Sequence, residues 1–217
     1  MNAGGIYPQI GNLRGWRYVV GMSDDAVTIR AVNQIPWSDT QTVFGTRGDP
    51  ARCWCQFYKI TNAQWQEGDH AKRESELCQQ VRNDTVAPGL VAYLGDEPVG
   101  WVAVEPRPHY PTALRGRVIS TGSHERLDDE SVWAIVCFVV RVGYRRRGLA
   151  LHLLRAAVQH AWANGARMIE GYPVEVVENQ RMSSAGLYHG TVSLFSAAGF
   201  TIDSRPIPGR ALMTLHS

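Results

Sequence analysis

The sequence has few cysteines and no long apolar run. Its four cysteines, at positions 53, 55, 78 and 137, include no Cys-x-x-Cys pair, which argues against a two-pair zinc site and leads us to expect free thiols. No stretch approaches the ~20 apolar residues that cross a bilayer, and the N-terminus lacks a charged region followed by an apolar block. We therefore expect a cytoplasmic protein with no metal and no membrane partner.

An excess of charge of one sign is also missing. The sequence carries 22 basic and 20 acidic residues, a formal net charge of +2, so its composition provides no overall field that would attract nucleic acid. The basic residues gather locally, at 141–147. A length of 217 residues suits one domain. We assign residues 25–217 to that domain and treat residues 1–24, which show weak periodicity, as an N-terminal extension.

The clearest pattern is a strand, an arginine-rich turn and a helix. Val132 to Val140 is almost unbroken apolar, which is typical of a buried central strand. After Gly148, apolar residues recur at helical spacing until Asn164-Gly165 supply a left-handed stop. The helix therefore begins at the turn, where unpartnered backbone N–H groups and the positive end of the helix dipole favour an anion. Because glycine has no Cβ, a phosphate can approach the backbone at position 148.

The remaining segments predict a mixed α/β fold. The expected strands lie near 27–32, 90–94, 98–104, 132–140, 167–172, 200–204 and 210–215. The expected helices are a short one from residue 36, one or two within 62–83, the helix after 148, and one that ends at Gly199 after a loop over 173–189. We expect a twisted mixed sheet of about six to seven strands with helices on both faces. The ligand cleft should lie at the carboxyl end of the central strand.

Arg145-x-x-Gly148-x-Ala150 resembles the Arg/Gln-x-x-Gly-x-Gly/Ala signature of the GNAT acyltransferases. A helix and a strand follow the signature, and Ser193 to Phe200 is similar to the family's Leu-Tyr-x-x-x-Gly-Phe helix ending. The resemblance covers roughly Leu90 to Leu215. The upstream Cys53-Trp54-Cys55 segment looks like that of a bacterial subgroup. The alternative interpretation is an ordinary strand–turn–helix unit with a solvated run of arginines.

The resemblance implies an N-acetyltransferase with acetyl-coenzyme A (acetyl-CoA) as co-substrate. The acetyl group would pass directly to a primary amine of a small molecule or peptide in a ternary complex, without a side-chain nucleophile. Pyrophosphate would bind the arginine turn, and pantetheine would enter where the central strand splays from the next one. The cofactor-binding residues so implied are Phe138, Val139, Val140, Arg145, Arg146, Arg147, Gly148, Leu149 and Ala150.

Two catalytic roles follow from the same resemblance. The N–H of Val140 could donate to the thioester carbonyl oxygen, where negative charge develops. The family's proton-donating tyrosine corresponds here to Phe195, which cannot donate. Tyr188, seven residues earlier, would share a face with Phe195 if the helix extends that far, so we predict Tyr188 as the acid. A packed aromatic or a hydrogen bond to the cofactor is its alternative role, and His189 and Ser193 are further options.

A general base is harder to choose, because several carboxylates and one histidine are available. Glu175, just beyond a strand that lines the cleft, is our first choice, and a solvated loop carboxylate is its alternative role. The other possibilities are Glu105, Glu170 and His124.

Aromatic and sulfur side chains are dense between Arg52 and Tyr58. We predict that Trp54, Phe57 and Tyr58 line the pocket for the amine acceptor, with plain core packing as the alternative. Cys137 is expected to be a small buried hydrophobe rather than an acyl carrier. A homodimer is possible. A second hypothesis of another class, motivated by Phe195, is a non-catalytic acyl-CoA sensor.

Overall fold

Strand β5 (Val132–Val140) has the same bounds as the apolar run that predicted it. It pairs antiparallel with β4 (Glu97–Pro106) and parallel with β6 (Met168–Gly171). From Val132 to Val136 every side chain is buried, as expected for a strand covered on both faces. The computed structural model describes residues 17–20, 26–176 and 184–217.

The described strands form one mixed sheet, in the order β1-β2-β3-β4-β5-β6-β8-β7. Its other strands are β1 (Arg17–Val20), β2 (Val27–Ala31), β3 (Gly89–Leu94), β7 (Thr201–Ile207) and β8 (Arg210–His216). Seven of the eight correspond to predicted strands, and the added one, β1, lies within residues 1–24. The mixed α/β architecture is therefore confirmed.

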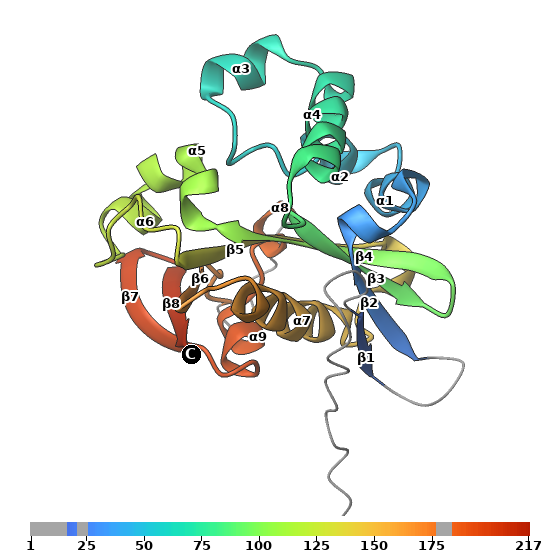
Figure 1. Ribbon diagram of the computed structural model, residues 1–217. Helices are drawn as coiled ribbons and strands as arrows, with labels where there is room; N and C mark the ends of the chain where they lie inside the picture. Colours follow the sequence, from blue (N-terminus) through green and yellow to red (C-terminus); the bar gives the residue numbers. More distant parts are fainter. Residues whose placement is uncertain (1–16, 21–25, 177–183) are drawn as a thin grey trace, which may run out of the picture.

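Helices cover both faces of the sheet (Figure 1). One face carries α1 (Trp37–Phe44), α2 (Gly48–Cys53), α3 (Asn62–Glu67) and α4 (His70–Asn83). The other carries α7 (Leu149–Ala163) and α9 (Val192–Ser196). Short helices α5 (Pro111–Arg115), α6 (Arg117–Ser120) and α8 (Ser184–Leu187) complete the set, with single 3-10 turns at Val32–Gln34, Arg107–His109 and Val142–Tyr144. In the part of the chain described here, no helix is long and apolar enough to cross a membrane.

The helix predicted to reach back from Gly199 stops early. Helix α9 begins at Val192, where the Thr191 hydroxyl caps it by accepting a hydrogen bond from the N–H of Leu194 (3.2 Å). Gly190, with φ of 74°, turns the chain just before the cap. Tyr188 therefore lies in a turn between α8 and α9, and the prediction that it shares a helix with Phe195 was wrong.

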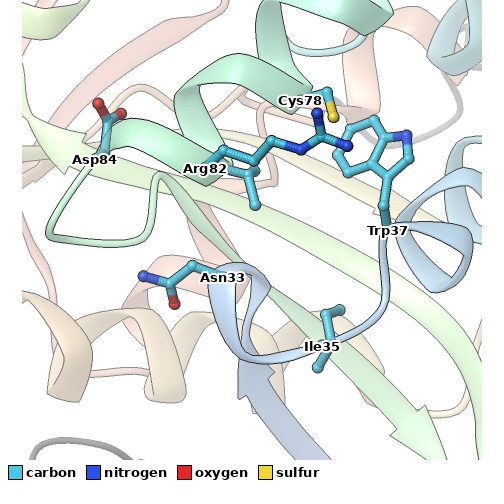
Figure 2. A pocket seen from close by; sticks show the side chains of 7 residues that line it. Asn33, Ile35, Trp37, Cys78, Arg82 and Asp84 are labelled. Atoms are coloured by element: carbon cyan, nitrogen blue, oxygen red, sulfur yellow. The ribbon is translucent and has the colours of Figure 1, made fainter.

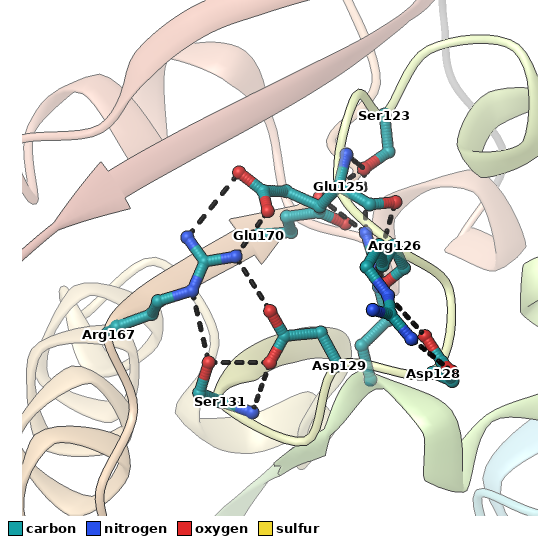
Figure 3. A network of polar contacts seen from close by, with 9 residues as sticks. Ser123, Glu125, Arg126, Asp128, Asp129, Ser131, Arg167 and Glu170 are labelled. Carbon is teal, nitrogen blue, oxygen red and sulfur yellow. Dashed lines mark hydrogen bonds and ion pairs between the residues drawn. The ribbon is translucent and has the colours of Figure 1, made fainter.

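A buried polar network fixes the loop between β4 and β5 to the sheet. The guanidinium of Arg107 donates to the carboxylate of Glu170 (2.8 Å), and both side chains are fully buried. Ser123 and Tyr172 donate to the same carboxylate (2.7 Å each). Figure 3 shows Ser123 and Glu170 beside a more exposed group of ion pairs around Arg167. Both terminal nitrogens of Arg107 and both carboxylate oxygens of Glu170 are hydrogen-bonded, so the network holds the loop to the sheet.

Candidate active site

The central strand is exposed along one edge at its carboxyl end. Pairing between β5 and β6 ends at Ile135 and Gly171, while β5 continues to Val140. Beyond that point the N–H of Phe138 donates to the carbonyl oxygen of Tyr188 (2.7 Å). The N–H of Val140 faces the same way as that of Phe138, because backbone groups alternate along a strand. The structure thus contains the gap between strands that the family resemblance implies.

A β-bulge at Val136 lies beside this gap. Pairing with β4 steps from Ala103–Cys137 to Val104–Ile135, which leaves Val136 without a partner residue. The Val136 carbonyl oxygen is 3.3 Å from Nδ1 of His189. Bulges of this kind often re-aim groups next to active sites. Here the bulge supplies the acceptor that positions a histidine.

The arginine turn and the start of α7 enclose a hollow of about 310 Å³. Gly148, with φ of 75°, is the residue before the helix, and no side chain caps the first turn of α7. A Cβ at Gly148 would project into open space, with no atom within 4 Å. The N–H of Leu151 donates to the carbonyl oxygen of Gly148 (3.0 Å), so the N–H groups of Leu149 and Ala150 are those available to a phosphate.

Most predicted cofactor-binding residues meet at this hollow, which we call the cofactor pocket. Its predicted members are Phe138, Val140, Arg145, Arg146, Gly148, Leu149 and Ala150. Val139 is not among them, because alternate side chains of β5 face opposite sides of the sheet. Arg147 is also absent from the lining, and its guanidinium lies over the ring of Tyr144 at 5.5 Å. Those two assignments are therefore not supported.

A second, larger hollow of about 720 Å³ lies on the other side of β5. We call it the acceptor pocket. Helices α1 to α4 and the turn at 188–189 line it together with Val136, Cys137 and Val139 of β5. Phe57 and Tyr58, predicted acceptor residues, belong to its wall. The chemistry of an acyl transfer requires two such spaces, one for each substrate.

Trp54, also predicted to line the acceptor pocket, does not. Its ring is buried and stacks on Phe44 (4.7 Å between centroids) and on Trp37 (5.8 Å). Trp54 and Cys55 both adopt the left-handed conformation, with φ of 47° and 53°. This turn directs the Trp54 ring into the core, where it supports the pocket wall formed by Phe44.

Tyr188 is the residue at which the two pockets meet, since it lines both. Burial raises the pKa of its hydroxyl, and the nearby Asp49 carboxylate raises it further. The hydroxyl therefore stays protonated at neutral pH and can donate a proton. Phe195, by contrast, is fully buried against Phe138 and Phe200. Gly171 makes room for its ring, because a Cβ there would lie 2.0 Å from the Phe195 ring.

The predicted general bases lie outside the acceptor pocket. Glu175, the first choice, forms an ion pair with Arg205 (2.6 Å), and Glu105 pairs with Lys59 (2.5 Å). Glu170 belongs to the buried network, and His124 lines neither pocket. The structure instead brings Asp49, Asp69, His70 and His189 to the acceptor pocket. No sequence pattern pointed to Asp49, because only the folded chain brings it to this pocket.

Three cysteines, Cys53, Cys55 and Cys137, line the acceptor pocket. Burial raises the pKa of Cys53 to about 12, and the pKa of Cys55 is also raised, through its contact with Cys137 and through burial. Cys53 and Cys55 are therefore protonated at neutral pH and are poor nucleophiles. The described residues contain no cluster of histidine, cysteine or carboxylate side chains that could hold a metal ion.

A further hollow of about 490 Å³ lies beside the carboxyl end of α4. Figure 2 shows Arg82 and Trp37 close together in its wall, with Asn33, Ile35, Cys78 and Asp84 around them. None of the residues predicted from the sequence lines this space.

The arginine turn and the first residues of α7 form a cradle for an anion, which we call the cradle. The two pockets, this cradle and the strand β5 that separates from β6 are the features expected of an acyltransferase. A family model decides the assignment. The acetyltransferase (GNAT) family model matches residues 54–190. The chain belongs to this GNAT family. The match includes the cradle, the whole of β5 and Tyr188.

Solved structures of similar fold include other GNAT proteins. The GNAT domain of S. lividans PAT has a TM-score of 0.51 at 13% identity, with 93% of this chain and 97% of that chain covered. A putative acetyltransferase from Salmonella typhimurium, solved with acetyl-CoA, has a TM-score of 0.50 at 15% identity (88% and 93% covered). An N-acetyltransferase from Thermoplasma acidophilum, solved with coenzyme A, has a TM-score of 0.50 at 13% identity (90% and 100% covered). These likenesses establish the GNAT fold. No curated protein matches the sequence.

Proposed function

We propose that this protein is an N-acetyltransferase that passes an acetyl group from acetyl-CoA directly to a primary amine. The observation that carries the proposal is that the cofactor pocket and the acceptor pocket lie on opposite sides of β5 and meet at Tyr188. Its cysteines are free thiols, so we further propose that it acts in the cytoplasm.

The cradle would hold the coenzyme A pyrophosphate. Leu149 and Ala150 of the first turn of α7 line the hollow, and the exposed guanidinium groups of Arg145 and Arg146 add positive charge. Arg145 is positioned by a hydrogen bond from its Nε to the carbonyl oxygen of Val140 (3.1 Å). This contact couples the cradle to the end of the strand along which pantetheine would run.

Val140 and Tyr188 would then act on the reacting atoms. Bound acetyl-CoA supplies an acetyl group activated as a thioester. The N–H of Val140 faces the gap and would stabilise negative charge on the carbonyl oxygen. A carbon–nitrogen bond forms as the carbon–sulfur bond breaks, the nitrogen releases its proton to water, and the Tyr188 hydroxyl protonates the leaving thiolate and regains a proton from water. No protein thiolate is required.

The sensor hypothesis is not favoured, because a pure binding module has no use for a second pocket that adjoins the first. Calorimetric titration of acetyl-CoA, followed by thiol release against a panel of amines and peptides, tests both hypotheses. We expect binding together with amine-dependent release of thiol. Binding without release by any amine would contradict the transferase, and absence of binding would contradict both hypotheses.

A further inference from the structure

The wall of the acceptor pocket is mainly apolar. Aromatic rings of Phe44, Phe57, Tyr58 and Trp65 form much of it. The Phe57 ring is 48% exposed, although it contacts Tyr58 and Trp65 edge to face at 5.1 and 5.4 Å. Protonated thiols of Cys53 and Cys55 add a neutral surface. A ligand that fills this pocket must therefore carry an apolar or aromatic body.

His189 and Tyr58 form a hydrogen-bonded pair in the pocket wall. His189 is neutral because burial lowers its pKa to about 4, so one ring nitrogen carries a proton. That proton is on Nδ1, since its partner is the Val136 carbonyl oxygen, which can only accept. Nε2 must then accept the bond from the Tyr58 hydroxyl (3.3 Å). The Tyr58 hydroxyl also interacts with the guanidinium of Arg210, so protein groups already pair with this part of the wall.

The charged side chains of the pocket wall give it no net charge. The lining contains two aspartates, Asp49 and Asp69, and two arginines, Arg52 and Arg73, so their formal charges cancel. Asp69 caps α4 through the N–H of Lys72 (2.8 Å), and Arg73 donates to the carbonyl oxygens of Trp65 and Gly68 (2.6 and 2.7 Å). A polyamine or a basic peptide would meet no net negative field here.

Asp49 is the carboxylate best placed to bind the reacting nitrogen. Among the described residues, none donates a hydrogen bond or forms an ion pair to its carboxylate. Its charge acts on Tyr188, the residue at the junction of the two pockets. An ammonium bound by Asp49 would therefore lie close to the point of acetyl transfer.

We propose that the acceptor is a primary monoamine with an aromatic or similarly apolar body, and that Asp49 binds its ammonium group. The inference rests on the proposed acetyltransferase function, and it selects a small molecule over a peptide. Asp49 binds and positions the amine, and the ammonium passes one proton to water before its nitrogen bonds to the acetyl carbon.

The proposal is tested by calorimetry, which measures the binding of 2-phenylethylamine to the protein saturated with coenzyme A. The wild type should bind this amine more tightly than spermidine and more tightly than 2-phenylethanol, its neutral analogue. Asp49→Asn should weaken amine binding at least tenfold while the affinities for coenzyme A and for 2-phenylethanol stay the same. Glu67→Gln is the matched control, because Glu67 is an exposed carboxylate at the end of α3 that does not line the pocket.

Equal amine affinity of Asp49→Asn and the wild type would overturn the proposal, as would tighter binding of spermidine or no binding of 2-phenylethylamine. The measurement does not require catalysis. A protein that binds the amine through Asp49 but releases no thiol keeps this acceptor site and loses the transferase function. If the Asp49→Asn variant acetylates amines as fast as the wild type, the transferase function stands and the proposed role of Asp49 in acceptor binding is wrong.

Discussion

The N–H of Phe138 donates a 2.7 Å hydrogen bond to the carbonyl oxygen of Tyr188. This bond fixes the turn before α9 against the free edge of β5, at the junction of the two pockets. It also occupies one of the backbone groups that the family resemblance assigns to pantetheine. Val140, two residues further along the same edge, remains as the donor nearest the cradle.

Replacement of Gly148 by leucine should abolish most coenzyme A binding. The side chain would enter the open space of the cradle, and φ of 75° is unfavourable for leucine. We expect roughly a hundredfold loss of affinity, about 2.7 kcal/mol, by calorimetry. Gly143→Leu is the control, since Gly143 lies on the same turn with open space and an ordinary φ. Unchanged affinity of Gly148→Leu would place the anion site elsewhere.

Tyr188→Phe should reduce turnover and leave coenzyme A affinity nearly unchanged. The variant keeps the ring that lines both pockets and loses the protonated hydroxyl. A positioned acid contributes roughly a hundredfold or more to rate, so kcat should fall by about that factor. Single-turnover kinetics with saturating amine measures the effect. Wild-type kcat in the variant would remove Tyr188 from the acid role.

Arg107→Met should destabilise the fold strongly. The substitution leaves the buried Glu170 carboxylate without its charged partner, a change that costs about 3–5 kcal/mol in comparable pairs. Urea unfolding measures the loss of free energy. Arg126→Met serves as control, because that ion pair with Asp128 is exposed and should contribute little. Equal midpoints for the two variants would contradict the structural role of the buried pair.

His189 should make the protein less stable as the pH falls from about 6.5 toward about 4. Burial, followed by the charge of Arg210, lowers its pKa in the folded state from 6.5 to about 4. In this window the unfolded chain binds a proton that the folded protein does not, so unfolding is favoured by at most about 1.4 kcal/mol per pH unit. The difference in unfolding free energy between wild type and His189→Asn should shrink accordingly in urea titrations. A constant difference across this window would show that His189 titrates normally.

Sequence patterns predicted those elements whose position depends on burial and periodicity within a short segment of the chain. The apolar run of β5 and the helical periodicity after Gly148 gave the element bounds and the cradle, because buried strands and amphipathic helices impose their periods on the sequence. Tyr188 was predicted at the site for the wrong reason, since the turn at Gly190 replaces the expected helix.

The acceptor side depended on tertiary structure. Asp49 shares the wall of the acceptor pocket with Tyr188, and nothing near Asp49 in the sequence indicates that the two residues come together. Trp54 looked like its neighbours Phe57 and Tyr58, yet the left-handed turn at Trp54 and Cys55 sends its ring into the core.

Because side chains alternate along β5, substitutions could change the acceptor pocket without changing the cofactor pocket. Phe138 and Val140 belong to one pocket, and Cys137 and Val139 belong to the other. Larger or smaller apolar residues at 137 and 139 would therefore reshape the space for the amine while the opposite face of the strand keeps its surface. Under the proposed function, one strand would carry a constant co-substrate on one face and a changing set of amines on the other.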